Sequence, residues 1–364
     1  MRDPGVSGID GADWAEAELI GDEGLGLDSL ERLGALGALA ETFGVEADTF
    51  AEQPPRVVGD WIDWIVRATA RSDRRVTVHT SGSTGVPRAC SHAIADLMDE
   101  ARFFAEQLPD RQRVVALVPA HHLYGIIWTA LLPQVLGVPV VTRTIGASLE
   151  LAAGDLVVAV PEQWRAIERL TRQFKADVIG VSSAGPLDDG VAAALLGKGL
   201  TRLIDIYGSS ETGAIGLRDL PDTAYELLPR WRLLADGTGD WRLVDAAGIA
   251  VDLPDHVERL GECRLRPTGR RDGAVQVAGH NVWPARVACV LSTVEGVAEA
   301  AVRLHVSGRL KAFVVPQAGE DVETLAKRLD QVIAGLLTEP ERPKMFRFGV
   351  RLPRNAMGKL EDWA

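Results

Sequence analysis

Short apolar runs alternate with amphipathic stretches through the middle of the chain. Helix-like stretches, such as residues 93–108, repeat apolar positions every three or four residues, whereas the strand-like runs are almost continuously apolar. Strands separated by helices of this length form a parallel sheet, whose ligand site lies at the carboxyl ends of the strands. The sequence therefore predicts an α/β fold with a parallel-sheet core. The strand-like runs are residues 113–118, 138–141, 156–160, 178–181 and 203–206.

Different patterns flank this core. Towards the amino terminus, residues 12–20 and 30–43 carry helical spacing and predict a short helical unit. Residues 225–265 alternate apolar and polar positions between turns, which predicts a small β subdomain of antiparallel strands. Beyond it, a hairpin, two helices and three strands predict a compact α+β cap. The predicted domains are residues 1–72, 73–268 and 269–364.

Composition narrows the possible functions. Of 364 residues, 46% are hydrophobic and 25% are charged, the balance of a globular protein with a sizeable core. A formal net charge of −12 argues against binding nucleic acid or an anionic membrane surface. No run reaches the roughly 18 apolar residues of a membrane span, and residues 1–5 open no targeting segment. Cys90, Cys263 and Cys289 lack disulfide or metal spacing, which indicates a reducing compartment. We expect a cytoplasmic protein.

The most distinctive stretch is a loop that follows the β-leaning residues 75–79. Its hydroxyl side chains alternate with glycines, so the backbone can bend tightly while N–H groups and hydroxyls point at one spot that suits a phosphate. An ordinary turn is the alternative interpretation. The pattern of a P-loop NTPase is missing, because no lysine-serine/threonine pair follows a second glycine. This phosphate loop consists of Thr80, Ser81, Gly82, Ser83, Thr84 and Gly85.

Three strand-like runs are followed by polar or glycine-rich loops, at residues 119–125, 182–187 and 207–213. Because the carboxyl ends of parallel strands meet at one edge of a sheet, we expect these loops to converge on one cleft. Glu211 in the third loop could hold Mg²⁺ against a triphosphate, since this cation prefers oxygen ligands. A solvated loop carboxylate is the alternative.

Five motifs follow one another along the chain, from the phosphate loop with Arg88 through residues 183–186, 207–211 and 269–272 to residues 353–359. In this order they resemble the motifs of the adenylate-forming superfamily, which includes acyl-CoA and aryl-CoA synthetases, peptide-synthetase adenylation domains and luciferases. The resemblance runs from about residue 75 to residue 361. It implies that ATP and Mg²⁺ activate a carboxylic acid as acyl-AMP, which then passes to a thiol of coenzyme A or of a carrier-protein phosphopantetheine. The motifs are the phosphate loop with Arg88, Ser183-Ala184-Gly185-Pro186, Tyr207-Gly208-Ser209-Ser210-Glu211, Gly269-Arg270-Arg271-Asp272, and residues 353–359 ending in Lys359.

The resemblance also implies roles for single residues. The phosphate loop and Arg88 would hold phosphates, residues 184–186 and 207–210 would bind ATP and its adenine, and Glu211 would bind Mg²⁺. Arg270 would contact a ribose or phosphate oxygen, and Lys359 would bridge the carboxylate and the α-phosphate as a point charge. Such preorganised donors and cations stabilise the charge that develops on the phosphates.

Two aspartates compete for the ribose hydroxyls that this family binds. Thr238-Gly239-Asp240 matches the usual tripeptide, but Asp255 lies 14 residues before Gly269, which is the spacing expected from the family. We predict that Asp255 binds the ribose and that Asp240 belongs to a hairpin turn.

For thiol transfer, the family rotates its cap about a hinge, here Asp272, and brings the loop at Gly279 to the active site. A glycine there lets a pantetheine arm pass closely, although turn geometry alone could also require it.

Residues 122–125 resemble the acyl-pocket segment of aryl-CoA ligases, which favours a small or aromatic acid over a fatty acid. The two histidines lack ligand spacing for a metal and are expected to point apart, one lining the pocket and one packing. The expected channel residues are His121, His122, Tyr124, Gly125 and Gly279.

Residues 20–68 resemble an acyl carrier protein, in which Ser29 would carry phosphopantetheine. Asp28 and Glu31, however, also form a capping-box pattern, which explains the aspartate without a carrier.

The family's long amino-terminal subdomain is missing, so the chain resembles a shortened ligase whose exposed flank is covered by residues 1–72 or by a homodimer. Two alternatives stay open: adenylation coupled to another nucleophile, as in amide formation or diazotisation, and a non-catalytic nucleotide-binding scaffold that docks carriers.

Overall fold

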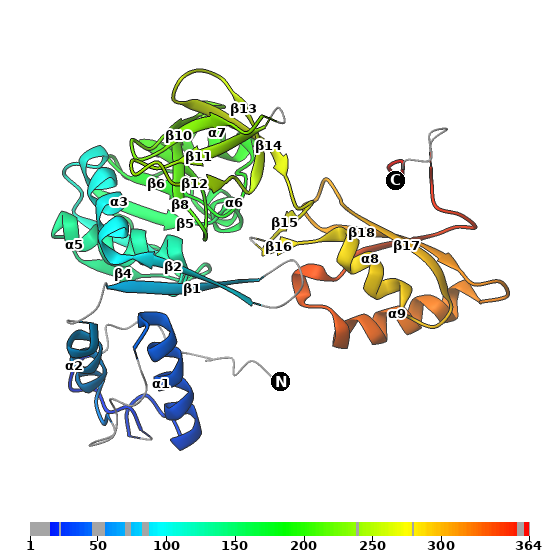
Figure 1. Ribbon diagram of the computed structural model, residues 1–364, viewed down its shortest axis with the longest axis horizontal. Helices are drawn as coiled ribbons and strands as arrows, with labels where there is room; N and C mark the ends of the chain where they lie inside the picture. Colours follow the sequence, from blue (N-terminus) through cyan, green and yellow to red (C-terminus); the bar gives the residue numbers. More distant parts are fainter. Residues whose placement is uncertain are drawn as a thin grey trace. The chain divides into compact units, whose positions relative to one another are not determined.

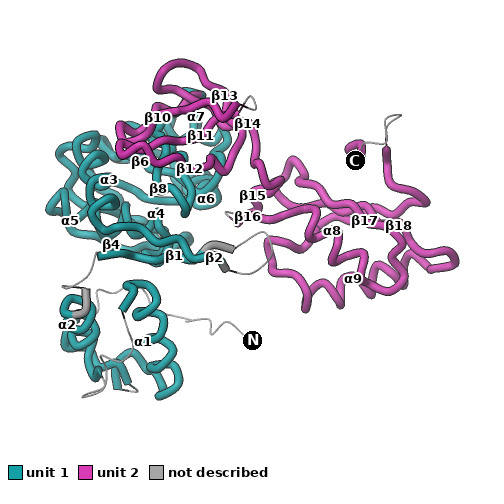
Figure 2. Tube along the Cα trace, in the orientation of Figure 1, with its two compact units in different colours: residues 1–80, 87–223 teal, residues 81–86, 224–364 magenta. Residues whose placement is uncertain are grey.

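The computed structural model describes residues 15–21, 23–45, 55–69, 74–81, 87–237, 240–278, 280–354 and 360–363. The chain divides into two compact units (Figure 2), one of residues 1–80 with 87–223 and one of residues 81–86 with 224–364. The boundary predicted at residue 268 falls inside the second unit, and the boundary predicted at residue 72 falls inside the first.

Six strands of the first unit lie side by side in one sheet (Figure 1). Five of them are parallel, in the order β4-β3-β5-β6-β7, as the sequence predicts, and β8 pairs antiparallel with β7. The strands are β3 (Arg113–Ala116), β4 (Val140–Thr142), β5 (Asp155–Ala159), β6 (Ile179–Ser182), β7 (Arg202–Ser209) and β8 (Gly213–Asp219).

Helices cover this sheet because the apolar strand residues need cover from water. Every residue of β5 and β6 is buried, and one cluster joins Val157 of β5 to Trp164 and Ile167 of α6 and to Leu195 of α7. The helices of the first unit's core are α3 (Ile94–Gln107), α4 (Leu123–Gly125), the π-helix η2 (Ile126–Leu131), α5 (Leu132–Leu136), α6 (Pro161–Leu170) and α7 (Asp189–Gly197).

A buried ion pair joins two neighbouring strands of this sheet. The Nε and Nη2 atoms of Arg113 on β3 donate to Oδ1 and Oδ2 of Asp155 on β5, at 2.7 and 2.9 Å. The Asp155 side chain is 1% exposed, and its hydrogen bond raises the pKa of Arg113 despite burial. The carboxylate therefore depends on this arginine for charge compensation.

The predicted amino-terminal helical unit is only partly present. The second predicted helix forms as α1 (Ser29–Phe43), and α2 (Val58–Thr69) follows it. The first helix is wrong for residues 15–20, because Leu19 instead makes an antiparallel bridge with Val57; residues 12–14 lie outside the described part. The capping box is confirmed: the Asp28 carboxylate accepts from the Glu31 N–H, and the Glu31 carboxylate accepts from the Asp28 N–H.

The strands β1 (Arg75–Ser81) and β2 (Pro87–Ala93) form a separate two-stranded sheet, and the chain passes from β2 directly into α3. The phosphate loop begins in the last two residues of β1. Residues 82–86 lie outside the described part of the chain.

The second unit contains the predicted antiparallel strands and the predicted α+β cap. The strands β10 (Arg232–Ala235), β11 (Trp241–Val244) and β12 (Ala250–Asp252) form one antiparallel sheet, and β13 (Asp255–Arg259), β14 (Arg264–Arg270) and β9 (Tyr225–Leu227) pair in that order. The cap follows with the hairpin β15 (Val275–Val277) and β16 (His280–Val282), then α8 (Pro284–Ser292), β17 (Val297–Leu304), β18 (Leu310–Pro316), α9 (Val322–Leu336), the 3₁₀ turn η3 (Glu339–Glu341) and β19 (Met345–Phe348).

Within the cap, α8 and α9 pack on one face of the sheet β17-β18-β19 (Figure 1). Leu291 of α8 and Leu329 of α9 share a core with Val302, Ala312 and Val314 of the sheet. Because side chains alternate along a strand, the neighbouring residues of β17 and β18 face the other side.

Two expectations about the whole chain can be compared with the structure. Cys90, Cys263 and Cys289 are all free, in agreement with the lack of disulfide spacing. Among the residues described, none of the helices combines the length and apolar composition that crossing a membrane would require.

Candidate active site

Hydrogen bonds bring the predicted loops together at the carboxyl ends of the parallel strands. The Tyr124 hydroxyl lies 3.3 Å from the carbonyl oxygen of Ala159 at the end of β5 and 3.0 Å from that of Val181 on β6. The Ser183 hydroxyl donates to the carbonyl oxygen of Ile206 on β7, at 2.9 Å. The loop after β3 therefore lies against the ends of β5 and β6, and the loop after β6 contacts β7, as expected for one ligand-binding edge.

The Tyr124 hydroxyl serves as a donor within this framework. Its burial raises the pKa of Tyr124 well above 10, and the nearby negative charge of Asp205 raises it further. The phenol therefore stays neutral and holds the loop on the ends of β5 and β6. Its role in an acyl channel remains a prediction.

The residues that follow Tyr124 in the chain are mostly buried in the core. A Cβ added to Gly125 would lie 2.0 Å from the carbonyl oxygen of Pro119, so the fold of this loop itself demands glycine. Trp128 is 1% exposed and packs against Phe104, with ring centroids 4.5 Å apart. It belongs to the core, as does the neighbouring Ile127.

The expectation for the two histidines is wrong. His121 and His122 lie in a turn rather than on a strand, so their rings come together, with centroids 4.2 Å apart, and both residues are exposed. Neither packs into the core. Among the residues described, no group of three or more histidine, cysteine, aspartate and glutamate side chains is arranged to hold a metal ion.

Glu211 lies exposed in the tight turn between β7 and β8. The turn is held from inside, because the Ser209 hydroxyl accepts from the Thr212 N–H at 3.2 Å and lies 3.0 Å from the Thr212 hydroxyl. A Cβ on Gly208 would lie 2.4 Å from the carbonyl oxygen of Gly213, which explains the glycine in this motif. The carboxylate of Glu211 is thus presented to solvent by a well-braced turn.

Two residues that sequence reasoning missed hold the same turn from outside. His92 on β2 places its Nε2 atom 2.7 Å from the carbonyl oxygen of Ser210. Glu100 on α3 is 2% exposed, and its two carboxylate oxygens each accept from the Ala214 N–H at 3.2 Å. The sequence carries a signal for Glu100, which is a carboxylate on the stripe formed by Leu97, Ala101 and Phe104.

The phosphate loop is described only at its edges. Thr80 and Ser81 end β1, and Arg88 lies exposed on β2. Gly82, Ser83, Thr84 and Gly85 lie outside the described residues, so their predicted contacts with phosphates remain predictions.

The loop after β6 contains a strained residue. Ala184 has a φ of 68°, in the left-handed region that costs a residue with a Cβ about 1–2 kcal/mol. Ala184 and Pro186 are exposed and Gly185 is half-buried. Strain of this kind is concentrated at functional sites, which agrees with the nucleotide-binding role predicted for this motif.

In the second unit, the predicted ribose residue begins β13, and the predicted hinge residue lies in the turn that follows β14. Asp255 begins β13 opposite Arg270 at the end of β14. Arg270 donates through Nε and Nη2 to the two carboxylate oxygens of Asp272, at 3.1 and 2.8 Å. Partial burial opposes ionisation of Asp272, but hydrogen bonds from Arg270 and the Ala274 N–H, together with the charge of Arg270, lower the pKa of the carboxyl.

The competing aspartate is held by its neighbours. Both oxygens of Asp240 have partners, Oδ1 with the Trp241 N–H and with Arg271 at 3.0 Å each, and Oδ2 with His256 Nδ1 at 2.7 Å. Although some burial opposes it, these partners lower the pKa of Asp240. Asp240 lies in the connection between β10 and β11, as the hairpin interpretation predicts. Gly279 and Lys359 lie outside the described residues.

Two family models match the chain. The model described as AMP-binding enzyme matches residues 38–263, and the model described as AMP-binding enzyme C-terminal domain matches residues 286–359. The matched residues include the phosphate loop, Glu211, Asp255 and Lys359.

Individual proteins are similar over most of the length. A 4-coumarate–CoA ligase from Halorhodospira halophila is 39% identical over 346 residues, covering 92% of this chain and 87% of the relative. A 4-coumarate–CoA ligase from Rhodobacter capsulatus is 39% identical over 363 residues, covering 94% and 91%. A solved double mutant of o-succinylbenzoate CoA synthetase from Bacillus subtilis has a TM-score of 0.61 at 19% identity, covering 78% of this chain and 67% of that one, and shows the same fold.

The similarity to these relatives extends into the amino-terminal segment of the chain. Because the first alignment leaves 8% of this chain uncovered, most of residues 20–68 lies in the part shared with the ligases. Ser29 is exposed at the first position of α1, and the capping box accounts for Asp28 before it. The carrier-like interpretation of this segment stays a prediction.

Proposed function

The chain belongs to the AMP-binding enzyme family and is an AMP-forming acid–thiol ligase, and from this premise we propose that it joins an aromatic acid of the 4-coumarate kind to coenzyme A. The observation that carries the proposal is the 39% identity to two 4-coumarate–CoA ligases over at least 92% of the chain. The braced Glu211 turn supports it, because activation of the acid needs a site for Mg²⁺ and ATP.

The first half-reaction attaches AMP to the acid. A carboxylate oxygen attacks the α-phosphorus of ATP in line, and the bond to pyrophosphate breaks. Lys359 would contact both the carboxylate and the α-phosphate, which brings two anions together and offsets their repulsion. Backbone N–H groups and hydroxyls of residues 80–85, with Arg88, would hold the β- and γ-phosphates of the leaving group.

Glu211 fits the Mg²⁺ that this chemistry needs. Its carboxylate is exposed, and its turn is fixed by Ser209, Thr212 and His92, so an oxygen ligand is presented without reorganisation. When bound, the cation would neutralise charge on the phosphates as pyrophosphate leaves. Glu211 would hold this cation, and the backbone of the turn would border the nucleotide.

We assign the ribose to Asp255. The two oxygens of Asp240 are occupied by Trp241, Arg271 and His256, which favours a structural role for Asp240. Arg271 also donates to the carbonyl oxygen of Asp255, at 3.3 Å, and so ties the two positions together. Arg270, opposite Asp255 in the pairing of β13 and β14, would contact a ribose or phosphate oxygen.

The second half-reaction transfers the acyl group to sulfur. The thiolate of coenzyme A attacks the acyl carbon, and AMP leaves with the electron pair of the broken C–O bond. The predicted hinge at Asp272 and the glycine at position 279 would serve this step after Lys359 has withdrawn. Coenzyme A is the acceptor proposed here, because the relatives are named CoA ligases.

The test uses the full chain and a panel of acids. ATP–pyrophosphate exchange should be fastest with 4-coumarate and related cinnamic acids and slow with fatty acids of similar length. Addition of coenzyme A should give the corresponding thioester, detected by mass. Preference for a fatty acid would overturn the acid class. Exchange without thioester, or thioester only on a phosphopantetheinylated carrier, would overturn the acceptor.

A matched pair of variants tests the machinery. Lys359→Ala should lose exchange but still form thioester from synthetic acyl-AMP and coenzyme A, whereas Lys344→Ala, which removes an exposed lysine of the cap, should keep both activities. Unchanged exchange in Lys359→Ala would contradict the proposed role of this lysine.

A further inference from the structure

The residues on either side of the segment that carries Lys359 pair with each other. Arg354 and Leu360 form an antiparallel bridge, and the Glu361 N–H donates to the carbonyl oxygen of Pro353 at 2.8 Å. Residues 355–359 lie outside the described part of the chain, and the described residues that flank them pair with each other. Residues 360–363, called the strap below, form the second side of this pairing.

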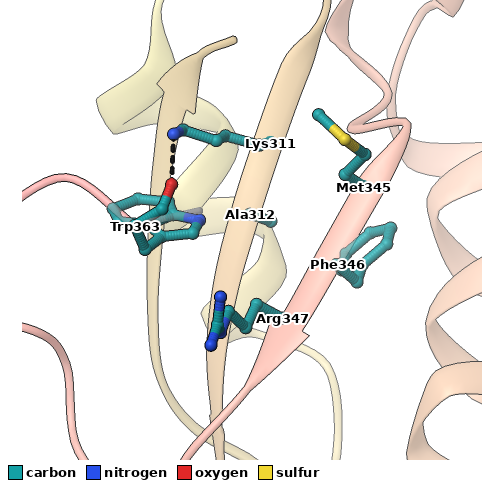
Figure 3. Close-up of a pocket in the computed structure, with 6 residues that line it drawn as sticks. All are labelled: Lys311, Ala312, Met345, Phe346, Arg347 and Trp363. Atoms are coloured by element: carbon teal, nitrogen blue, oxygen red, sulfur yellow. Dashed lines mark hydrogen bonds between the residues drawn. The ribbon is translucent and has the colours of Figure 1, made fainter.

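Two basic side chains on the strands of the cap sheet hold the strap. Lys311 on β18 donates to the carbonyl oxygen of Trp363 (Figure 3), and its ammonium lies 2.8 Å from Oδ1 of Asp362. Arg303 on β17 donates to the carbonyl oxygen of Leu360 at 2.6 Å, one residue after Lys359. Backbone and side-chain oxygens of the strap are therefore fixed to two neighbouring strands.

The strap also completes the core of the cap. Trp363 is 7% exposed and packs with Phe313, at a centroid distance of 5.8 Å, and with Ala301, Val315 and Leu352. These strand residues alternate with those that face α8 and α9, so the strap covers the sheet face that the helices leave open. The indole thus anchors the strap by burial of apolar surface.

Lys311 is a buried lysine, and a buried ion pair of this kind usually adds little to the free energy of unfolding. The residue is 5% exposed, and removing an ammonium group from water is costly unless it is compensated. Its compensation comes from the strap, through Asp362, the Trp363 carbonyl oxygen and the indole face at 5.3 Å. The cation is placed where it fixes the residues that follow Lys359.

We propose that Arg303, Lys311 and Trp363 are positioning residues for adenylation, which hold the strap, and with it the part of the chain that immediately follows Lys359, on the cap sheet. This inference rests on the proposed function of Lys359. It predicts a specific defect, because Lys359 serves the first half-reaction and is withdrawn in the second. Loss of the anchor should therefore slow adenylation and spare thioester formation.

The experiment measures the half-reactions separately in the full chain. Lys311→Met and Trp363→Leu should reduce the kcat of ATP–pyrophosphate exchange by about 10- to 100-fold, the range expected for a small misplacement of a catalytic group. The KM for ATP should stay within about twofold, since neither side chain is placed against the nucleotide, and thioester formation from synthetic acyl-AMP should also stay within about twofold. Lys311→Arg should recover part of the exchange, because arginine keeps the positive charge and the N–H donors but is larger than the buried lysine.

Two further variants keep the test decisive. Asp362→Asn weakens the anchor at a side chain that is 67% exposed, so it should fold normally and still show the selective loss. Lys344→Met removes an exposed lysine of the same cap and should change neither half-reaction. Equal loss of both half-reactions in Lys311→Met and Asp362→Asn, or no loss of exchange in either, would overturn the inference.

The same assays separate this inference from the function on which it rests. If Lys359→Ala abolishes exchange while Lys311→Met and Trp363→Leu leave it intact, only the positioning role fails. If Lys359→Ala itself leaves exchange intact, the proposed role of that lysine fails, and the positioning role fails with it.

Discussion

His92 Nε2 lies 2.7 Å from the carbonyl oxygen of Ser210, although 118 residues separate the two. A carbonyl oxygen only accepts, so Nε2 carries the proton of this hydrogen bond. His92 lies on β2, the strand that follows the phosphate loop, and Ser210 precedes Glu211. The contact therefore joins the strand that follows the phosphate loop to the turn that carries Glu211.

This relationship predicts a selective effect of His92 variants on ATP use. His92→Ala removes a hydrogen bond worth about 0.5–1.5 kcal/mol, so we expect the KM for ATP to rise about two- to tenfold in pyrophosphate exchange. His92→Gln should retain most of the affinity, because its amide nitrogen can reach the place of Nε2. An unchanged KM in His92→Ala would contradict the proposed coupling. His305→Ala, at an exposed hairpin of the cap, is the matched control.

How far the sequence could predict the structure depended on how local each signal was. The strands β5 and β6 were predictable because a short, continuously apolar run is typical of a strand that is buried on both faces of a parallel sheet. The helix expected over residues 12–20 fails where Leu19 pairs with Val57, since a pairing at that distance leaves no trace in local periodicity. The strand β8 was missed because two of its seven residues are glycines, a residue type that is depleted in strands.

The candidate site followed the same rule. The positions of Glu211 and of residues 182–187 after parallel strands were predictable, because apolar runs precede both, and their roles in binding stay predictions. The supports of the site were not, because His92 and Glu100 act through contacts across the fold. The clustering of His121 and His122 was missed for the opposite reason, since the expectation assumed a strand where the chain turns.

Gly125 provides a test of what this loop requires. A methyl group at this position would meet the carbonyl oxygen of Pro119 at 2.0 Å, so Gly125→Ala should destabilise the first unit by about 1–3 kcal/mol, as overpacking does. The measurement is the midpoint of thermal unfolding. Gly197→Ala, in open space at the end of α7, should leave the midpoint unchanged or raise it. A Gly125→Ala variant as stable as the wild type, but defective only in thioester formation, would favour a role in the channel instead.

The ion pair between Arg113 and Asp155 predicts a large loss of stability when it is broken on one side. Arg113→Met leaves a carboxylate that is 1% exposed without its charge partner and should cost about 3–5 kcal/mol. Denaturant unfolding at pH 7 gives this difference. The exposed pair of Arg266 and Glu258 is the control, because Arg266→Met should cost about 1 kcal/mol or less. The double variant Arg113→Met with Asp155→Leu should recover part of the loss, since no charge is then buried.

The pair formed by Arg270 and Asp272 predicts a dependence on pH. Partial burial opposes it, but the hydrogen bonds and charge of Arg270 hold the pKa of Asp272 below its usual value of about 3.9. A carboxyl whose pKa is lowered in the folded state stabilises that state above the unfolded pKa, and this contribution is lost as the pH falls through the folded pKa. Asp272→Asn should therefore lower the unfolding midpoint at pH 7, by an amount equivalent to about 1 kcal/mol or less because the pair is partly exposed. The difference from the wild type should shrink as the pH falls below about 4.

Carboxyl-carbon NMR gives the direct measurement of this pKa. In the wild type, Asp272 should titrate below the usual value for aspartate, and in Arg270→Met its midpoint should rise, because the guanidinium supplies both a bidentate hydrogen bond and a positive charge. The Ala274 N–H, which also donates to Asp272 at 3.0 Å, remains in that variant, so the rise should be partial. A midpoint that does not move on removal of Arg270 would mean that the Ala274 N–H and Trp283, rather than the guanidinium, stabilise the carboxylate at the predicted hinge.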